Sequence, residues 1–544
     1  MHNSIPNVPK PINEPIMSYA PGSSERASLK ARLKELLRRE IEIPLVIGGK
    51  RVKTGSLGDC RCPHDHAHLL GRYHKAGPTE IERAVSAARK AWPEWSRMPW
   101  NERAAIFLRA AELLAGPWRE TLNAATMLAQ SKNAFQAEID SACELIDFWR
   151  FNPWYAQAIY AQQPPYSPTG TWNYVEQRPL EGFVFAVTPF NFTSIAGNLP
   201  TAPAMMGNTV LWKPASSAVY SAWYLIELLR EAGLPHGVIN FVPGSGGSVG
   251  DPVLASPELA GIHFTGSTAV FQGMWTTVGR NIARYHGYPR IVGETGGKDF
   301  VVAHSSADVD ALAVGLTRGA FEYQGQKCSA ASRAYVPKSL WPKLRNRLYG
   351  MLDSLKMGDV QDFSNFINAV IDRASYESIT AYIKQAKRAA GARVDYGGGF
   401  DDKVGYYVQP TVILAENPRY RTMCEEIFGP VLSVHVYEDR RWAETLRLCD
   451  ATSPYALTGA VFATERRAVI EAHDALRHSA GNFYVNDKPT GAVVGQQPFG
   501  GGRASGTNDK AGSMVNLLRW VSPRTVKENL NPPRDYRYPF LAEP

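Results

Sequence analysis

Short apolar segments alternate with helical ones from Gly182 onward, and this alternation restricts the possible folds more than any other feature. The first series has predicted strands at 183–187, 209–212 and 238–242, with predicted helices at 195–206 and 218–232. Strands that alternate with helices form βαβ units and a parallel sheet. A second series has strands at 299–302, 334–336 and 459–462 and a helix at 312–321. We therefore predict an α/β protein with a domain boundary near Gly297.

The chain on either side of these series has a different character. A strand pair is predicted over 43–52, turned at Gly48-Gly49, and helices are expected from there to about Tyr160. The segment QQPPYSPTG at 162–170 breaks helix and leads into a predicted strand at 171–178. We expect this strand to form a projecting arm, and the Pro-rich C-terminal end to lie on a neighbour or on the surface.

Composition and charge exclude several classes of protein. A chain of 544 residues can bury large cores, and its length favours two or three domains. The net charge of +8 comes from lysines and arginines scattered among nearly as many acids, and the basic run 30–40 has the spacing of an amphipathic helix. We therefore expect no nucleic-acid partner.

The N-terminus has no apolar signal core and no stretch is long enough to span a bilayer, so no membrane partner is expected. A cytoplasmic location is predicted, or the mitochondrial matrix for a processed organellar form.

Three residues have side chains suited to covalent catalysis. Cys328 in GQKCSA is a candidate nucleophile, which would need Lys327, backbone N–H groups or a bound cofactor to favour its thiolate. Glu294 precedes two nearby glycines and can act as a base toward water. Asn191, after an apolar strand, can donate its amide to an oxyanion. Taken singly, each also fits a structural role: a small buried thiol, a solvated glutamate or a turn residue.

Two glycine-containing turns are candidates for binding a cofactor. PGSGGSVG at 243–250 joins a strand to a helix but misses the GxGxxG spacing of the dinucleotide fingerprint. FTGS at 264–267 is a second strand-to-helix turn whose amides can face a pyrophosphate, and Lys213 ends a neighbouring strand. Each signal is weak on its own.

The segment CRCPHDHAH at 60–68 holds five cysteines and histidines within nine residues. Its spacings match no common zinc site, and its alternation favours a strand with one solvent-facing edge. We predict no metal site. The six cysteines of the chain are too few and too dispersed for a disulfide scaffold, which favours a reducing compartment.

The motifs TPFNF, LWKPAS, FTGS, ETGGK, GQKCSA, EEIFGPVL and QPFGGG occur in this order across nearly the whole chain. In this order they resemble the aldehyde dehydrogenase superfamily. The resemblance implies that Cys328 is the nucleophile, that Glu294 is the base for thioester hydrolysis, and that Asn191 helps form the oxyanion hole. It also implies NAD as cofactor. The implied cofactor-binding residues are Pro189, Phe190, Lys213, Gly266, Ser267, Glu426 and Phe428.

Finer motifs resemble one branch of that superfamily, which oxidises L-glutamate γ-semialdehyde to L-glutamate in proline catabolism. They are ELIDFWRFN, ETGGKDFV, GQKCSAASRAYVP and TGAVVGQQPFGGGRASGTND. The resemblance implies that backbone amides of Gly491 and Ala492 hold the substrate's α-carboxylate, with Ser329 binding it and Phe499 packing on the aliphatic part. Glu144 is expected to pair with Lys327 or with the substrate's ammonium group. Another semialdehyde, such as succinate semialdehyde, and a noncatalytic scaffold remain as alternatives.

The resemblance also implies an arrangement of domains and partners. A Rossmann-type NAD-binding domain is expected at 1–161 and 179–297, a catalytic domain at 298–505, and a small β oligomerisation arm with a tail at 162–178 and 506–544. A homodimer or larger even assembly is expected, with a proline dehydrogenase as a further possible partner.

Two positions depart from the superfamily pattern. Phe271 replaces a glycine expected after FTGS, which puts the details of the pyrophosphate loop in question. Ser216 replaces an acid often found after KP, so repulsion of a 2′-phosphate is weaker and NADP is allowed as a poorer cofactor than NAD.

Overall fold

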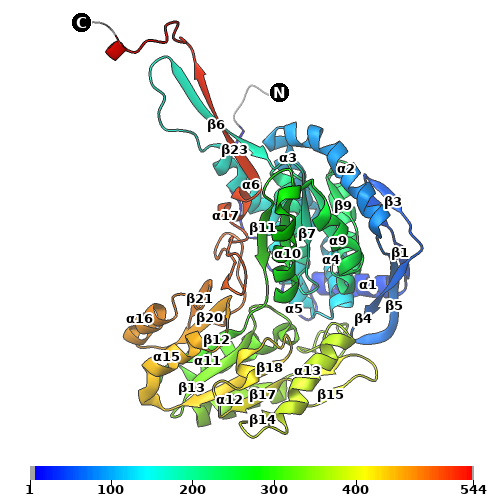
Figure 1. Cartoon of the computed structure of the whole chain (residues 1–544). Coiled ribbons are helices and arrows are strands. Elements are labelled where there is room, and N and C mark those ends of the chain that lie inside the picture. The colour runs from blue at the N-terminus through cyan, green and yellow to red at the C-terminus, as the bar shows by residue number, and fades with distance from the viewer. Residues whose placement is uncertain (1–5, 542–544) are drawn as a thin grey trace.

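The computed structural model describes residues 6–541, and two seven-stranded sheets organise the chain (Figure 1). In the first sheet the strands from β11 to β9 are parallel, and β2 and β3 extend the β9 edge in antiparallel fashion. Its spatial order is β11 (Arg290–Glu294), β10 (Leu259–Thr265), β7 (Phe183–Val187), β8 (Thr209–Lys213), β9 (Ile239–Phe241), β2 (Leu45–Ile47) and β3 (Lys50–Val52). The predicted strands and the predicted strand pair are confirmed, with small shifts at their ends.

Helices cover both faces of this sheet because its strands are apolar on both sides. Along β7, Val184 and Ala186 contribute to one core, and Phe183 and Phe185 contribute to the other. The first core includes residues of α1 (Ser24–Leu37), α3 (Trp100–Ala115), α4 (Arg119–Gln130), α6 (Leu145–Tyr160), α7 (Thr193–Met205) and α8 (Val219–Glu231). The second includes residues of α2 (Pro78–Arg97), α9 (Gly246–Ala255) and α10 (Thr268–Asn281).

The second sheet starts directly after the predicted boundary. All its pairs are parallel except β14–β17. Its order is β14 (Ala392–Tyr396), β17 (Thr411–Ala415), β18 (Val431–Tyr437), β13 (Ala331–Pro337), β12 (Asp299–Ala303), β20 (Thr458–Phe462) and β21 (Asn482–Val485). Its helices are α11 (Val309–Phe321), α12 (Trp341–Ser354), α13 (Arg373–Ala386), α15 (Trp442–Ala451) and α16 (Arg466–Ala475). The second predicted α/β series is also confirmed.

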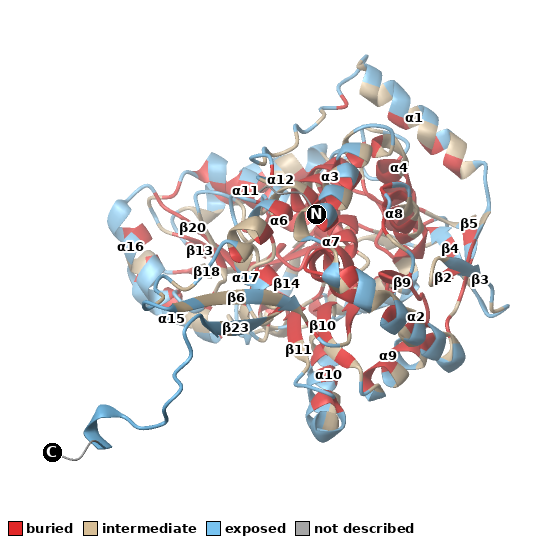
Figure 2. Ribbon diagram, turned by 90° about the horizontal axis from the view of Figure 1, so that it is seen from above, coloured by how far each residue is buried: buried red, intermediate tan, exposed pale blue. Residues whose placement is uncertain are grey.

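A two-stranded arm projects from the body of the molecule (Figure 1). It pairs β6 (Thr171–Pro179) with β23 (Val521–Asn529) in antiparallel register. Figure 2 shows that the arm and the following C-terminal segment are mostly exposed or half-buried, unlike the two α/β bodies. The predicted arm strand is confirmed. The expectation that the tail begins at 506 is wrong at its start, because α17 (Met514–Leu518) packs on the body and Leu517 and Trp520 are buried.

The expectation of helices from 52 to 160 is wrong over 57–74. There β4 (Leu57–Cys62) and β5 (Asp65–His74) form an antiparallel hairpin, and β5 also pairs with β1 (Ile41–Ile43). Many of the hairpin residues are polar, so its strands lack the apolar runs that mark strands in the sheets. Cys60 and Cys62 face the core, with Arg61 exposed between them. Within residues 6–541, no three His, Cys, Asp or Glu side chains gather as metal ligands would.

Helix α1 agrees with the amphipathic helix expected around the basic run. Leu29, Leu33 and Leu36 are buried against the body, and most of the charged side chains face outward. In the described part of the chain, no helix has both the length and the apolar character needed to cross a bilayer.

Candidate active site

Cys328 lies in a sharp turn between α11 and β13. Tyr323 and Gln324 both have left-handed backbone conformations, with φ of 50° and 55°, and Gly325 follows at 65°. Such conformations are unfavourable for residues with a side chain and persist only where surroundings impose them. Here the Gln324 side chain donates to the carbonyl oxygens of Ser131 (3.0 Å) and Ala369 (2.8 Å). These two hydrogen bonds to residues outside the turn fix its conformation, and the conformation sets the position of the Cys328 thiol.

Carboxylates surround the Cys328 thiol. Its pKa is raised well above the usual value by burial, and further by Asp299, Glu294 and Glu426. Lys327 was expected among the groups favouring the thiolate, but its ammonium group lies 3.2 Å from the Glu322 carboxylate instead. Charge in this site therefore favours the thiol, and a positive charge near the sulfur would favour the thiolate.

Asn191 follows β7 and reaches the turn that holds Cys328. Its Nδ2 donates to the carbonyl oxygen of Gln326 at 3.0 Å, and the side chain is buried. Asn191 and Cys328 line the same cavity. An amide donor is thus held beside the thiol, as the sequence predicted.

Glu294 ends β11 and turns toward the glycine-rich segment near the C-terminus. Its Oε2 accepts from the backbone N–H of Gly501 at 3.1 Å. Burial raises its pKa well above the usual value, while the Gly501 contact and nearby Lys510 oppose that rise. The Lys510 ammonium itself donates to the carbonyl oxygens of Gly481 (2.8 Å) and Gly500 (3.0 Å). Glu294 is near enough to Cys328 to affect its pKa, but it lines neither cavity described below.

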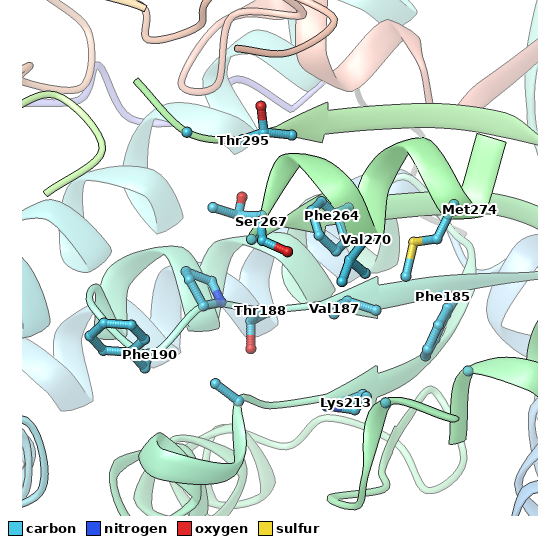
Figure 3. Close-up of a pocket in the computed structure, with 18 of the residues that line it drawn as sticks. Phe185, Val187, Thr188, Phe190, Lys213, Phe264, Ser267, Val270, Met274 and Thr295 are labelled. Carbon is cyan, nitrogen blue, oxygen red and sulfur yellow. The ribbon is translucent and has the colours of Figure 1, made fainter. Parts of the chain in front are cut away.

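A cavity of about 810 Å³ lies at the carboxyl ends of the first sheet (Figure 3). All seven predicted cofactor-binding residues line it, together with Asn191 and Cys328: Pro189, Phe190, Lys213, Gly266, Ser267, Glu426 and Phe428. Gly246, Gly247 and Gly250, from the turn without a GxGxxG spacing, line it as well. Ligands of α/β sheets bind at the carboxyl ends of the strands.

The cavity walls fit a dinucleotide. Ser267 caps α10 and Gly246 begins α9, so the N-termini of both helices face the cavity, where phosphates are favoured. Lys213 is buried and makes only a long contact of 3.4 Å, to the Pro214 carbonyl oxygen, and burial alone lowers its pKa. A ribose or phosphate oxygen would give this ammonium group the partner it lacks. Glu426 is held by the backbone N–H of Gly297 at 2.9 Å.

Phe271, the residue that departs from the family pattern, turns away from this cavity. Its ring stacks on Phe264 with centroids 5.3 Å apart, and Gly293 lies directly under it, where an added Cβ would be 2.3 Å from the ring. The larger side chain is therefore accommodated by a glycine on the neighbouring strand. The loop at 265–267 remains open to the cavity.

A second cavity of about 380 Å³ lies on the other side of Cys328. All six predicted substrate-binding residues line it: Glu144, Lys327, Ser329, Gly491, Ala492 and Phe499. Cys328 lines both cavities. The Ser329 hydroxyl is hydrogen-bonded to that of Thr490 at 2.8 Å, which joins the turn of Cys328 to the loop of Gly491.

The predicted contact between Glu144 and Lys327 is wrong. The Ser194 hydroxyl donates to Glu144 at 2.9 Å, and Lys327 pairs with Glu322. Burial and nearby Asp140 raise the pKa of Glu144 to about 8. Glu144 therefore faces the cavity without a cationic partner from Lys327.

Sequence reasoning missed several charged residues of this cavity. Lys488 lines it and lies 3.0 Å from Glu322, which thus bridges two lysines. Glu14 and Asp147 line the cavity as well, together with the uncharged Asn13. In the sequence, Lys488 could have been recognised only by its charge close to the glycine of DKPTG. Nothing in the sequence around Asn13 and Glu14 indicates that they line a cavity.

Comparisons with known proteins agree with this arrangement. The family model described as "Aldehyde dehydrogenase family" matches residues 52–526. The mitochondrial delta-1-pyrroline-5-carboxylate dehydrogenase of Dictyostelium discoideum is 52% identical, over 100% of this chain and 98% of that protein. The NAD-bound crystal structure of the Mycobacterium tuberculosis delta-pyrroline-5-carboxylate dehydrogenase has a TM-score of 0.96 and 55% identity, with 100% of both chains covered.

A longer protein also contains this fold. The crystal structure of proline utilization A from Bdellovibrio bacteriovorus matches with a TM-score of 0.89 and 29% identity, over 96% of this chain and 54% of that chain. The similarity thus covers nearly all of this chain and about half of the longer one.

Proposed function

The chain belongs to the aldehyde dehydrogenase family, and from that membership and its site we propose that it oxidises L-glutamate γ-semialdehyde to L-glutamate with NAD. The semialdehyde is the open form of delta-1-pyrroline-5-carboxylate. Relatives that carry the name of this activity match over the full chain.

The observation that carries this proposal is the meeting of two cavities at Cys328. One cavity has helix N-termini, which favour phosphates, and a buried lysine, Lys213, with only a long contact to Pro214. The other is smaller and has charged walls. A thiol between them can attack an aldehyde from one side while the same carbon faces a hydride acceptor on the other side.

The first half-reaction forms a bond between the Cys328 sulfur and the aldehyde carbon. The Asn191 amide and the Cys328 backbone N–H stabilise the negative oxygen of the resulting thiohemiacetal. NAD, when bound, supplies the acceptor for the hydride and a positive nicotinamide ring. That charge opposes the carboxylates that hold Cys328 in its thiol form. Loss of hydride from the thiohemiacetal leaves a thioester on Cys328.

The second half-reaction hydrolyses the thioester. Glu294 takes a proton from water as the water attacks the thioester carbon, and the Cys328 sulfur leaves. This requires the Glu294 carboxylate to turn from Gly501 toward Cys328, since it lines neither cavity in its present position. The Cys328 thiol loses its proton before attack and regains one when the sulfur leaves. One aldehyde, one NAD and one water yield L-glutamate with its new carboxylate ionised, NADH and two protons.

The charges of the smaller cavity support an amino-acid aldehyde as substrate. Lys327 and Lys488, which share Glu322, line it together with Gly491 beside Lys488, and these groups are taken as the basic end. Glu144 and Asp147, which are close enough for Asp147 to raise the pKa of Glu144, are taken as the acidic end. An α-carboxylate fits the first end and an α-ammonium group fits the second. Succinate semialdehyde would leave the acidic end without a partner, because it has no ammonium group.

The NAD-bound relative supports NAD as the preferred cofactor. Ala215 lines the larger cavity, and Ser216 is exposed just beyond it. No carboxylate at position 216 repels a 2′-phosphate, so NADP is expected to serve as a weaker cofactor.

We also propose an assembly and a location. The arm presents exposed Trp172, and the segment after β23 presents Leu530 and Tyr536, which favours a second copy of the chain as partner. The proline utilization A relative supports a proline dehydrogenase as a further partner. The mitochondrial relative supports the matrix location over the cytoplasmic one, and fractionation of the source cells would separate the two.

The deciding experiment is NADH formation with delta-1-pyrroline-5-carboxylate, succinate semialdehyde and propanal, using NAD and then NADP. We expect kcat/KM for the first substrate to exceed the others by about tenfold or more, which corresponds to about 1.4 kcal/mol of transition-state discrimination. Equal turnover of the other aldehydes would leave the dehydrogenase chemistry intact and refute the substrate.

A further inference from the structure

The residues before α1 form an extended strap, here defined as residues 6–20, which contributes to the lining of the substrate cavity. It has no regular secondary structure, yet Asn13, Glu14 and Ile16 line the cavity. The strap is fixed at several points along its length. The backbone N–H of Val8 donates to Gln157 at 2.6 Å, and the N–H of Met17 donates to Glu138 at 2.9 Å.

Glu14 ties the middle of the strap to the helices beneath it. Its carboxylate lies 2.5 Å from Arg119 and 2.6 Å from Arg150, and only a tenth of its side chain is exposed. Its backbone N–H donates to Asp147 at 2.8 Å. Arg119 is itself buried, so loss of this contact would leave a buried cation with fewer acidic partners. The strap is therefore part of the folded body.

The loop 490–497, here termed the anchor loop, has hydrogen bonds of its own at Val493: its N–H donates to the Gln497 side chain at 3.0 Å, and its carbonyl oxygen accepts from the N–H groups of Gln496 and Gln497. Gly491 and Gly495 have left-handed φ values of 97° and 83°, and most of the loop is exposed. Gly495 is pressed against Phe151, whose ring would be 2.1 Å from an added Cβ. The hydrogen bonds of Val493 lie within the loop, so hydrogen bonds between the loop and the acidic wall of the cavity come from elsewhere.

Asn13 supplies those contacts. Its Nδ2 donates to Asp147 at 2.8 Å and to the carbonyl oxygen of Val494 at 2.7 Å, and its Oδ1 accepts from the side chain of Gln496 at 2.9 Å. One amide thus joins α6 to the anchor loop with all of its strong hydrogen-bonding atoms engaged. The loop is held at a fixed distance from the acidic wall of the cavity.

We propose that Asn13 is a positioning residue for the substrate, which sets the anchor loop so that a substrate's carboxylate and ammonium group can be bound at the same time. The inference rests on the proposed function, because it requires a substrate with both charges. The strap is then part of the substrate site, although it begins more than three hundred residues before Cys328 in the sequence. Aldehydes without a carboxylate do not need the loop in that position.

The test compares Asn13→Ala and Gln496→Ala with the unchanged full-length protein. For Asn13→Ala we expect KM for delta-1-pyrroline-5-carboxylate to rise by about tenfold, and by less for Gln496→Ala, with kcat nearly unchanged. Turnover of propanal and the KM for NAD should stay constant in both. Asn7→Ala is the matched control, because Asn7 lies on the same strap and accepts from Gln157 at 3.1 Å, away from the cavity.

The outcomes separate this inference from the proposed function. Equal losses with propanal and with pyrroline-5-carboxylate would mean that Asn13 serves general stability, and would overturn the inference. So would an unchanged KM in an Asn13→Ala protein that turns over propanal normally. If the unchanged protein oxidises propanal but not pyrroline-5-carboxylate, the proposed function fails and the inference fails with it.

Discussion

The two cavities that meet at Cys328 are built in different ways. The larger one is lined mostly by residues of consecutive βα units between 185 and 277, with a few from 295–428. The smaller one gathers residues from the N-terminal strap, from α6 and the segment before it, from the turn of Cys328 and from the anchor loop. A cofactor site shared by a family can be local in sequence, whereas a site for one substrate can be assembled from both ends of the chain.

Replacing the residue that both cavities share should have the largest effect. Cys328→Ala removes the nucleophile, so we expect loss of turnover by about 10⁴-fold or more with every aldehyde. Binding of NAD, measured by calorimetry, should persist, because the larger cavity keeps its other walls. Substantial turnover by this variant would contradict the assigned nucleophile.

A change confined to the smaller cavity should distinguish substrates. Lys488→Met removes one cation beside Gly491, and we expect kcat/KM for pyrroline-5-carboxylate to fall by about tenfold with propanal unaffected. Lys338→Met is a matched control, since Lys338 pairs with Glu438 at the surface. A fall of the same size with propanal would show that Lys488 does not act through the substrate's charge.

The acidic end of the smaller cavity should respond to pH. Because the pKa of Glu144 is raised to about 8, this carboxyl group binds more protons in the folded protein than in the unfolded chain between about pH 4.5 and 8. It therefore destabilises the folded state progressively as pH rises through that window. We expect Glu144→Gln to gain a few degrees in Tm relative to the unchanged protein between pH 5 and 8. Parallel Tm curves for the two proteins would refute the raised pKa.

The smallest effect is expected at the rim of the larger cavity. Ser216→Glu places a carboxylate beside the site proposed for the adenosine ribose, so kcat/KM with NADP should fall by about threefold while that with NAD holds. The exposure of position 216 limits the effect through solvent screening. A change of equal size with both cofactors would place the ribose elsewhere.

The contrast between a cavity built from neighbouring segments and one built from distant segments also explains which features the sequence could predict. The parallel strands and the cofactor cavity follow from apolar runs and turn motifs that are each complete within a short segment. Of the hairpin at 57–74, only strand character within 60–68 was predicted, because polar residues hide the strand pattern in the rest. Asn13 carries no local sign of its role, since Asp147 and Val494 reach it only through the tertiary fold. The expected pairing of Lys327 with Glu144 was wrong because Glu322, five residues before Lys327, binds its ammonium group instead.

The pairing of the arm has a consequence for the synthesis of the chain. Within residues 6–541, strand β6 pairs only with β23, and Arg178 donates to Ser522, which lies 344 positions further on. At ordinary translation speeds of about 5 to 20 residues per second, β6 leaves the ribosome roughly 20 to 70 seconds before its partner. An unpaired strand edge invites association with other chains. Glu176, Arg178 and Pro179 on β6 disfavour such pairing. These residues therefore protect the unpaired β6 from association with other chains until β23 has been synthesised.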